Sequence, residues 1–154
     1  MATLKSEEKQ IPSFIRFDLT GEVREEGRWL SYRLTISSGG KELLLEDQAD
    51  EVGRCWLSLE PFDEVKRLIE GLEAFLRGGK TFSFEPQEPN FEILLSREEL
   101  GFSVYCFIDS GNALHDHATW DGLGLRMFSS KEHLEAFLAE LKAETRIFSA
   151  VTER

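Results

Sequence analysis

An amphipathic stretch near the middle of the chain, residues 61–79, most constrains how the rest must fold. Its apolar residues recur at intervals of three and four, at Phe62, Val65, Leu68, Ile69, Leu72, Phe75 and Leu76. This is the spacing of one face of an α-helix, and the charged residues between them, Glu64 among them, form the polar face. Gly78-Gly79 predicts the end of the helix, because glycine readily adopts the left-handed conformation of a C-cap. An apolar face requires a partner surface, so we expect this helix to pack on a sheet.

Segments with the alternating pattern of β-strands lie on both sides of this helix. Residues 29–37 alternate most clearly, with apolar side chains facing one way and polar side chains facing the other. This pattern is typical of an antiparallel sheet with one buried and one solvated face. Further strands are predicted at residues 13–20, 41–46, 54–57, 81–85, 91–96, 101–109 and 123–128.

A second helix is predicted to begin at Ser129, because Glu132 completes a capping box with it. The apolar face of this helix consists of Leu134, Phe137, Leu138 and Leu141. The order of strands, helix, strands and helix lacks the alternation that is typical of a parallel sheet. We therefore predict an α+β fold: a single domain at residues 13–150, with a mostly antiparallel β-sheet and two amphipathic helices packed on one face. Residues 1–12 are polar and charged, and we expect a flexible N-terminal segment there.

Charge and cysteine content narrow the classes of partner and the compartment. The 154 residues carry a formal net charge of −11, which repels nucleic acid and anionic membranes and attracts a basic protein partner. Cys55 and Cys106 are too few for a disulfide framework, so we expect two buried, reduced thiols. The sequence shows no secretion signal and no apolar run long enough to span a membrane. A cytoplasmic protein without membrane contact is predicted, and its oligomeric state stays open.

One segment, residues 112–122, concentrates side chains that can bind metals. If the segment is extended, His115 and His117 point the same way, and Asp121 lies near them. A transition-metal site is one interpretation, and a solvated loop between two strands is the other. Trp120 is either a core residue or an exposed anchor for a partner. Because no nucleophile motif, phosphate loop or dinucleotide fingerprint occurs, we predict neither catalysis nor a cofactor.

The order of motifs around the first helix resembles a known family. A strand that begins with tryptophan (WLSYRLTI) precedes the helix and its double glycine, and a Phe-rich strand and the segment EPNFEIL (Glu88 to Leu94) follow. From Phe14 to Asp109 this order resembles the WapI-type immunity proteins of bacteria and related small domains of unknown function. The resemblance implies a compact cytosolic protein that binds and neutralises a toxin domain, often a nuclease, without catalytic residues of its own. It does not cover the histidine-containing segment.

The predicted partner-binding surface is an acidic rim with one aromatic neighbour: Glu46, Asp47, Asp50, Glu51, Glu85, Glu88 and Trp120. The two parts of the rim come together if the strand at 81–85 runs antiparallel to the strand at 41–46 within one sheet. Our first hypothesis is a non-catalytic interaction protein of the immunity type with a basic, nuclease-like partner. The alternatives are a small-ligand or regulatory binding module, and a metal-binding protein that uses His115, His117 and Asp121.

Overall fold

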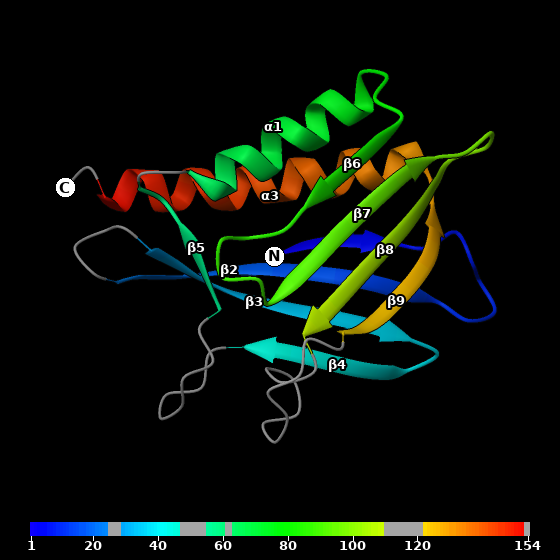
Figure 1. Ribbon diagram of the computed structural model, residues 1–154, viewed down its shortest axis with the longest axis horizontal. Coiled ribbons are helices and arrows are strands. Elements are labelled where there is room, and N and C mark those ends of the chain that lie inside the picture. The colour runs from blue at the N-terminus through cyan, green and yellow to red at the C-terminus, as the bar shows by residue number, and fades with distance from the viewer. Residues whose placement is uncertain (25–28, 47–54, 61–62, 110–121, 153–154) are drawn as a thin grey trace.

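The computed structural model describes residues 1–24, 29–46, 55–60, 63–109 and 122–152, which contain nine strands and two helices (Figure 1). In chain order the elements are β1 (Ala2–Lys5), β2 (Ser13–Arg24), β3 (Trp29–Ser38), β4 (Lys41–Glu46), β5 (Trp56–Ser58), α1 (Glu64–Leu76), β6 (Thr81–Phe84), β7 (Phe91–Arg97), β8 (Phe102–Asp109), β9 (Gly122–Ser129) and α3 (Lys131–Thr152). Every strand and helix predicted from the sequence has a counterpart among them, and β1 is additional.

The strands divide between two antiparallel sheets. The N-terminal sheet has the order β1-β2-β3-β4, and β5 pairs with β3 at Trp29–Ser31, beyond the part of β3 that pairs with β4. The C-terminal sheet is a meander with the order β6-β7-β8-β9. The predicted α+β class, with antiparallel strands and two helices, is confirmed. The strands form two sheets rather than the expected one, because the segment β5-α1-β6 carries the chain from the first sheet to the second.

Aromatic rings join the buried faces of the two sheets. The Phe91 ring of β7 lies 5.8 Å from the Phe17 ring of β2 and 5.2 Å from the Tyr32 ring of β3, measured between centroids. Burial raises the pKa of the Tyr32 hydroxyl well above its usual value, and the neighbouring Cys55 adds to this shift. The two sheets therefore share one hydrophobic core, in which this hydroxyl stays neutral.

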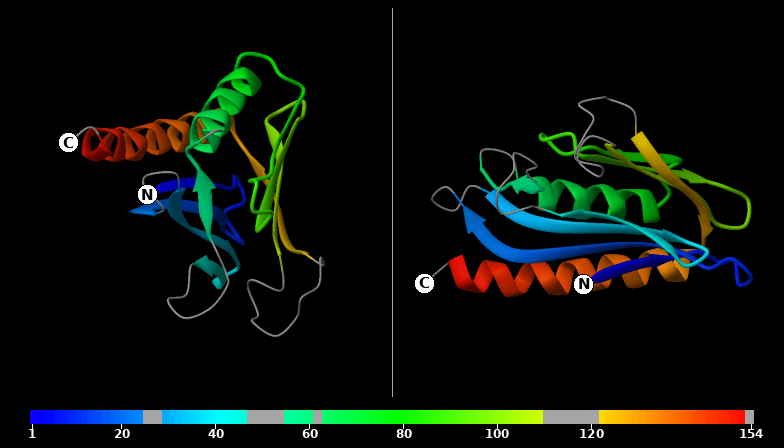
Figure 2. Two further views of the ribbon diagram at one scale, coloured as in Figure 1. Left: turned by 60° about the vertical axis from the view of Figure 1, so that its left-hand side comes forward. Right: turned by 90° about the horizontal axis from the view of Figure 1, so that it is seen from below.

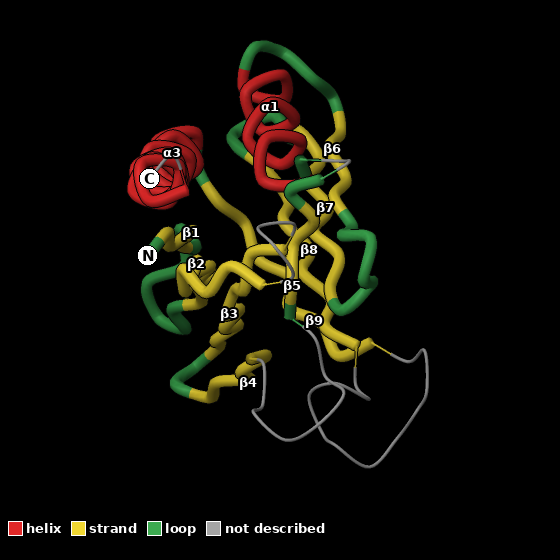
Figure 3. Tube along the Cα trace, turned by 90° about the vertical axis from the view of Figure 1, so that its left-hand side faces the viewer, coloured by secondary structure: helices red, strands yellow, loops and turns green. Residues whose placement is uncertain are grey.

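Both helices lie on the same side of the molecule, across the opening between the two sheets (Figures 2 and 3). Helix α1 contacts β5 and β6, whereas α3 runs along β1 and β2. The predicted apolar faces are buried: Val65, Leu68, Leu72 and Phe75 in α1, and Leu134, Phe137, Leu138 and Leu141 in α3. An ion pair between Glu73 and Lys142 joins the two helices. In the described part of the chain, neither helix is long and apolar enough to cross a membrane.

Residues 1–12 were expected to form a flexible segment, but part of this segment is the strand β1. Strand β1 pairs with β2, and its residues Ala2 and Leu4 are buried in the core. On the edge of β1 that does not pair with β2, the Thr3 N–H donates to the Glu140 carboxylate of α3 at 2.8 Å. Two alternating apolar residues are too few to indicate a strand, because the pattern is recognised over four or more residues.

The start of α3 also differs from the prediction. The Ser130 hydroxyl accepts a hydrogen bond from the His133 N–H at 3.3 Å, so Ser130 caps the first turn. Ser129 is buried instead, and its hydroxyl donates to the Lys5 carbonyl oxygen at 2.7 Å. The predicted capping box of Ser129 and Glu132 is therefore wrong by one residue, because Ser129 ties the end of β9 to the end of β1.

Substitutions on opposite faces of α1 test this packing. Leu72→Ala is expected to lower the free energy of unfolding by about 2–5 kcal/mol, because buried methyl groups are lost and a cavity remains. Glu70→Ala, at an exposed position of the same helix, is expected to change it by less than about 0.5 kcal/mol. Urea denaturation followed by circular dichroism measures both values. Equal effects would show that α1 packs through a different face.

Candidate functional site

The outer face of the C-terminal sheet is the candidate partner-binding surface. Within the described residues, no helix or strand covers this face (Figures 2 and 3). Three cross-strand rows form its centre: Ser96-Ser103-Phe128, Leu94-Tyr105-Arg126 and Glu92-Phe107-Gly124. Phe107 and Phe128 are 37% and 39% exposed, respectively. Exposed aromatic side chains on one uncovered sheet face are typical of protein interfaces, in which aromatic residues are enriched.

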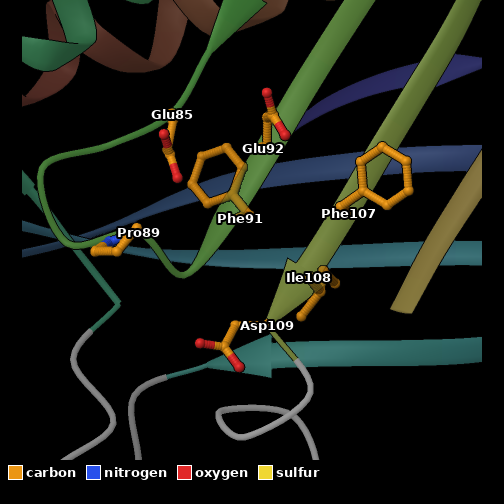
Figure 4. Close-up of a pocket in the computed structure, with 7 residues that line it drawn as sticks. All are labelled: Glu85, Pro89, Phe91, Glu92, Phe107, Ile108 and Asp109. Carbon is orange, nitrogen blue, oxygen red and sulfur yellow. The ribbon is translucent and has the colours of Figure 1, made fainter. Parts of the chain in front are cut away.

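A shallow hollow of about 410 Å³ lies on this face, where β8 ends (Figure 4). Its lining residues are Glu85, Pro89, Phe91, Glu92, Phe107, Ile108 and Asp109. Three of these residues carry carboxylates, which come from the loop after β6, from β7 and from the end of β8. Among the described residues, no basic side chain lines the hollow. The hollow is therefore electronegative and favours a cationic group over an anionic one.

The Phe107 ring lies against the neighbouring strand β9. A Cβ atom at position 124 would lie 2.5 Å from the ring atom Cδ1 of Phe107, so glycine alone leaves room for the ring there. An aromatic side chain that covers a glycine on the next strand stabilises the pairing at that point. Tyr105 stacks beside Phe107, with 6.4 Å between ring centroids and 15° between ring planes. The Arg126 guanidinium lies 5.4 Å from the Tyr105 ring centroid.

A buried carboxylate, Glu64, holds the loop that forms one wall of the hollow. Its side chain accepts backbone N–H groups from Ser58 at 2.7 Å and from Gln87 at 2.6 Å. Arg67 pairs with the same carboxylate at 3.3 Å and also donates to the carbonyl oxygen of Glu85. These contacts connect β5, the first turn of α1 and the loop between β6 and β7. The position of Glu85 at the hollow therefore depends on Glu64 and Arg67.

The helical spacing predicted Glu64 on the polar face of the helix, and this prediction is wrong. The residue is 1% exposed, because β5 and the loop after β6 close over the first turn of α1. Both segments present backbone N–H groups there, which a carboxylate can accept. Helical spacing contains no signal for this burial, since it arises from segments outside the helix. The neighbouring Asp63 is an ordinary N-cap, which accepts from the Lys66 N–H at 2.8 Å.

The described members of the predicted acidic rim lie on different elements, one at the end of β4 and two in the loop after β6. Glu46 ends β4 in the N-terminal sheet and pairs with Arg33 at 2.9 Å. Glu85 lines the hollow beside the C-terminal sheet, and Glu88 lies half-buried in the same loop. The shared sheet from which their adjacency was predicted does not occur, because β4 and β6 belong to different sheets. Outside the described residues lie Asp47, Asp50, Glu51 and Trp120.

Among the described residues, the metal-binding and thiol side chains form no candidate metal site and no reactive thiol. The predicted metal ligands His115, His117 and Asp121 lie outside the described residues. Among those described, no group of three His, Cys, Asp or Glu residues could hold a metal ion. Cys55 and Cys106 are buried free thiols, as predicted. Burial raises the pKa of the Cys106 thiol to about 12, so it stays protonated at neutral pH and is a poor nucleophile.

Comparison with known proteins identifies one family, and the matched region includes the hollow and the residues that support it. A family model described as the immunity protein WapI-like family matches residues 4–149. The match extends past Asp109, where the resemblance noted from the sequence ends, and includes α3 almost to its end. No curated protein and no solved structure matches the chain.

Removing the Glu64 carboxylate tests its role in supporting the hollow. Glu64→Ala is expected to lower the free energy of unfolding by about 2–6 kcal/mol, since the buried Ser58 N–H and the partly buried Gln87 N–H lose their acceptor at roughly 1–3 kcal/mol each. Hydrogen exchange of the Gln87 amide is expected to accelerate as well. Chemical denaturation and native-state exchange measured by NMR check both effects, with Glu70→Ala as the exposed control. An unchanged Gln87 exchange rate would contradict the assigned hydrogen bond.

Proposed function

The chain belongs to the WapI-like family of immunity proteins, and we propose that it acts without catalysis by binding and neutralising a basic, nuclease-like protein toxin. The observation that carries this proposal is the family match over residues 4–149. An immunity protein must recognise its toxin with a surface that is free in the absence of the toxin. We further propose that the protein acts in the cytoplasm, where a toxin that degrades nucleic acid reaches its substrate.

The charge of the chain supports a basic partner. A nuclease holds the phosphates of its substrate with positively charged groups around its active site. An inhibitor that covers such a site benefits from negative charge, because complementary potentials speed association and exclude wrong partners. The net charge of −11 and the three carboxylates of the hollow have the required sign.

The proposed contact surface combines the acidic rim with the outer face of the C-terminal sheet. Glu85 belongs to both, since it is one of the residues singled out in the sequence and also lines the hollow. Phe107 and Phe128 supply exposed aromatic area on the same face. Interfaces of this composition, with aromatic residues at the centre and charged residues around them, are common among tight complexes. The remaining rim residues proposed for the contact are Glu46, Asp47, Asp50, Glu51, Glu88 and Trp120.

The second candidate function is a small-ligand or regulatory binding module. The hollow favours it to the extent that its volume, about 410 Å³, falls within the range of small-ligand sites, roughly 300–1,000 Å³. Such sites are mostly apolar and bury most of their ligand, however, whereas this hollow is shallow and carries three carboxylates. A protein partner that covers the whole face fits this geometry better.

Growth rescue tests the proposed function directly. Where a gene that flanks the gene of this chain encodes a candidate toxin domain, that domain is expressed from an inducible promoter, alone and together with the chain. Co-expression is expected to restore growth, and purified chain is expected to abolish the toxin activity when the two proteins are equimolar. An unrelated acidic protein of similar size is the control. Full toxin activity at excess chain would contradict neutralisation, and inactivation by far less than an equimolar amount would contradict a non-catalytic mechanism.

Charge reversal tests the contact surface. Glu85→Lys with Glu88→Lys is expected to slow association with the toxin by about tenfold or more at low salt, because long-range attraction to a basic partner is lost. The difference should shrink at high salt, since the Debye length falls from about 10 Å at 0.1 M to about 3 Å at 1 M. Stopped-flow or biosensor kinetics measure both rates.

The matched control for this experiment is Glu70→Lys with Glu135→Lys. It changes the net charge equally but lies on the exposed sides of α1 and α3. Equal slowing by the two double variants would show that only the total charge matters. That result would remove the loop after β6 from the interface.

A further inference from the structure

We propose that Phe107, Glu92 and Glu85 form a binding site for an arginine side chain presented by the protein partner. The guanidinium would stack on the Phe107 ring and pair with the surrounding carboxylates. This inference rests on the proposed function and specifies the chemistry by which the partner is recognised. It is carried by the orientation of one ring, by the carboxylates around it, and by a similar contact on the same sheet face.

The Phe107 ring is held in place as a platform. Its edge lies over Gly124, where a Cβ atom would approach Cδ1 to 2.5 Å and Cε1 to 2.7 Å. The outer side of the sheet faces the viewer in Figure 4, and the ring is seen there face-on. With 37% exposure, the ring presents a π-face to solvent. Arginine stacks on such a face by cation–π attraction, and its planar guanidinium matches the ring.

Carboxylates surround this platform. Glu92 stands directly opposite Phe107 in the β7–β8 register, a position in which Cβ atoms are roughly 4.5–5.5 Å apart. Glu85 and Asp109 line the same hollow. In the part of the chain that the structure describes, the carboxylates of Glu85 and Glu92 have no hydrogen-bond or ion-pair partner. They are therefore available to accept the N–H groups of an incoming guanidinium.

The neighbouring row of the sheet shows the same contact made within the chain. Arg126 of β9 lies over the Tyr105 ring of β8, at 5.4 Å from the centroid. Phe107 is the next outward-facing residue of β8, and its cross-strand neighbour on β9 is Gly124 instead of an arginine. Among the described residues, no cation lies over the Phe107 ring. The partner would thus supply at this ring the cation that Arg126 supplies at Tyr105.

The chemistry of the hollow decides the class of the occupant. A nucleic acid is disfavoured, because the surrounding carboxylates and the net charge of −11 repel phosphates. An apolar side chain would leave Glu85 and Glu92 without partners beneath it. An arginine meets both requirements, since it stacks on the ring and presents five N–H donors to the carboxylates. A basic protein segment is therefore the occupant that fits.

The test is an NMR titration of the full-length, ¹⁵N-labelled protein with a hexa-arginine peptide that is acetylated and amidated at its ends. The amide signals of Glu92, Phe107 and Gly124 are expected to shift most. Phe107→Leu keeps an apolar side chain but removes the π-face, and Glu92→Gln removes one charge. Each is expected to weaken peptide binding by about fivefold or more.

Two matched controls separate the site from general electrostatics. Phe14→Leu makes the same change on the N-terminal sheet, where the cross-strand neighbours of this half-buried ring are Lys5 and Ser37, and Glu99→Gln makes the same charge change in the exposed turn between β7 and β8. Both are expected to stay within about twofold of the unmodified protein. Equal weakening by Glu92→Gln and Glu99→Gln, or unchanged binding by Phe107→Leu, would overturn the proposal. The dispersion of the amide signals verifies that each variant is folded.

The peptide titration and the growth rescue fail independently. If the protein neutralises the toxin but Phe107→Leu and Glu92→Gln rescue growth as well as the unmodified chain, the arginine site is wrong and the proposed function stands. If the peptide binds at Phe107 but the chain neither binds nor neutralises the toxin, the proposed function is wrong, while the site remains as a site for basic peptides.

Discussion

The contact between Phe91 and the rings of Phe17 and Tyr32 joins the two sheets, and the positions of the other elements depend on it. Once each sheet has buried one face against the other, the remaining opening must be closed, and the apolar faces of α1 and α3 close it. Neither helix is then available to cover the outer face of the C-terminal sheet. The aromatic residues of that face, Phe107 and Phe128, stay exposed as a consequence of where the core lies.

Acidic residues have two distinct roles in this protein. Glu64 and Glu144 are buried and accept backbone N–H groups, from Ser58 and Gln87 in the first case and from Leu19 in the second. They connect helices to strands and are enclosed by their donors, so they are inaccessible to a partner. The net charge of −11 therefore overstates the negative charge that a partner meets. The carboxylates at the hollow matter more than the total, because charge acts on a partner only where it is exposed and close.

Periodicity predicted the strands, the helices and their buried faces, because each of these depends on the side chains within the element. Periodicity did not predict the division into two sheets, because alternation shows that one face of a strand is buried but not which element covers that face. The burial of Glu64 was not predicted for the same reason: β5 and the loop after β6 bury it, and both lie outside the helix. For the candidate site, the acidic character and Glu85 were predicted. The platform at Phe107 was not, because it depends on Gly124, a residue whose relation to Phe107 appears only in the β8–β9 register.

If the protein inhibits a toxin, the carboxylates and exposed rings on one face affect both the association rate and the residence time of the complex. Attraction between opposite charges acts over a distance of about 10 Å at 0.1 M salt and chiefly raises the association rate. Residence time depends instead on desolvated contacts at the centre of an interface, where aromatic residues and arginine contribute most. An inhibitor of a lethal enzyme needs both, because the toxin must be captured before it acts and must not be released. In the hollow, Glu85 and Glu92 lie beside the Phe107 ring, so charge attraction and a desolvated aromatic contact act at the same site. An arginine of the partner is the side chain that can make both interactions.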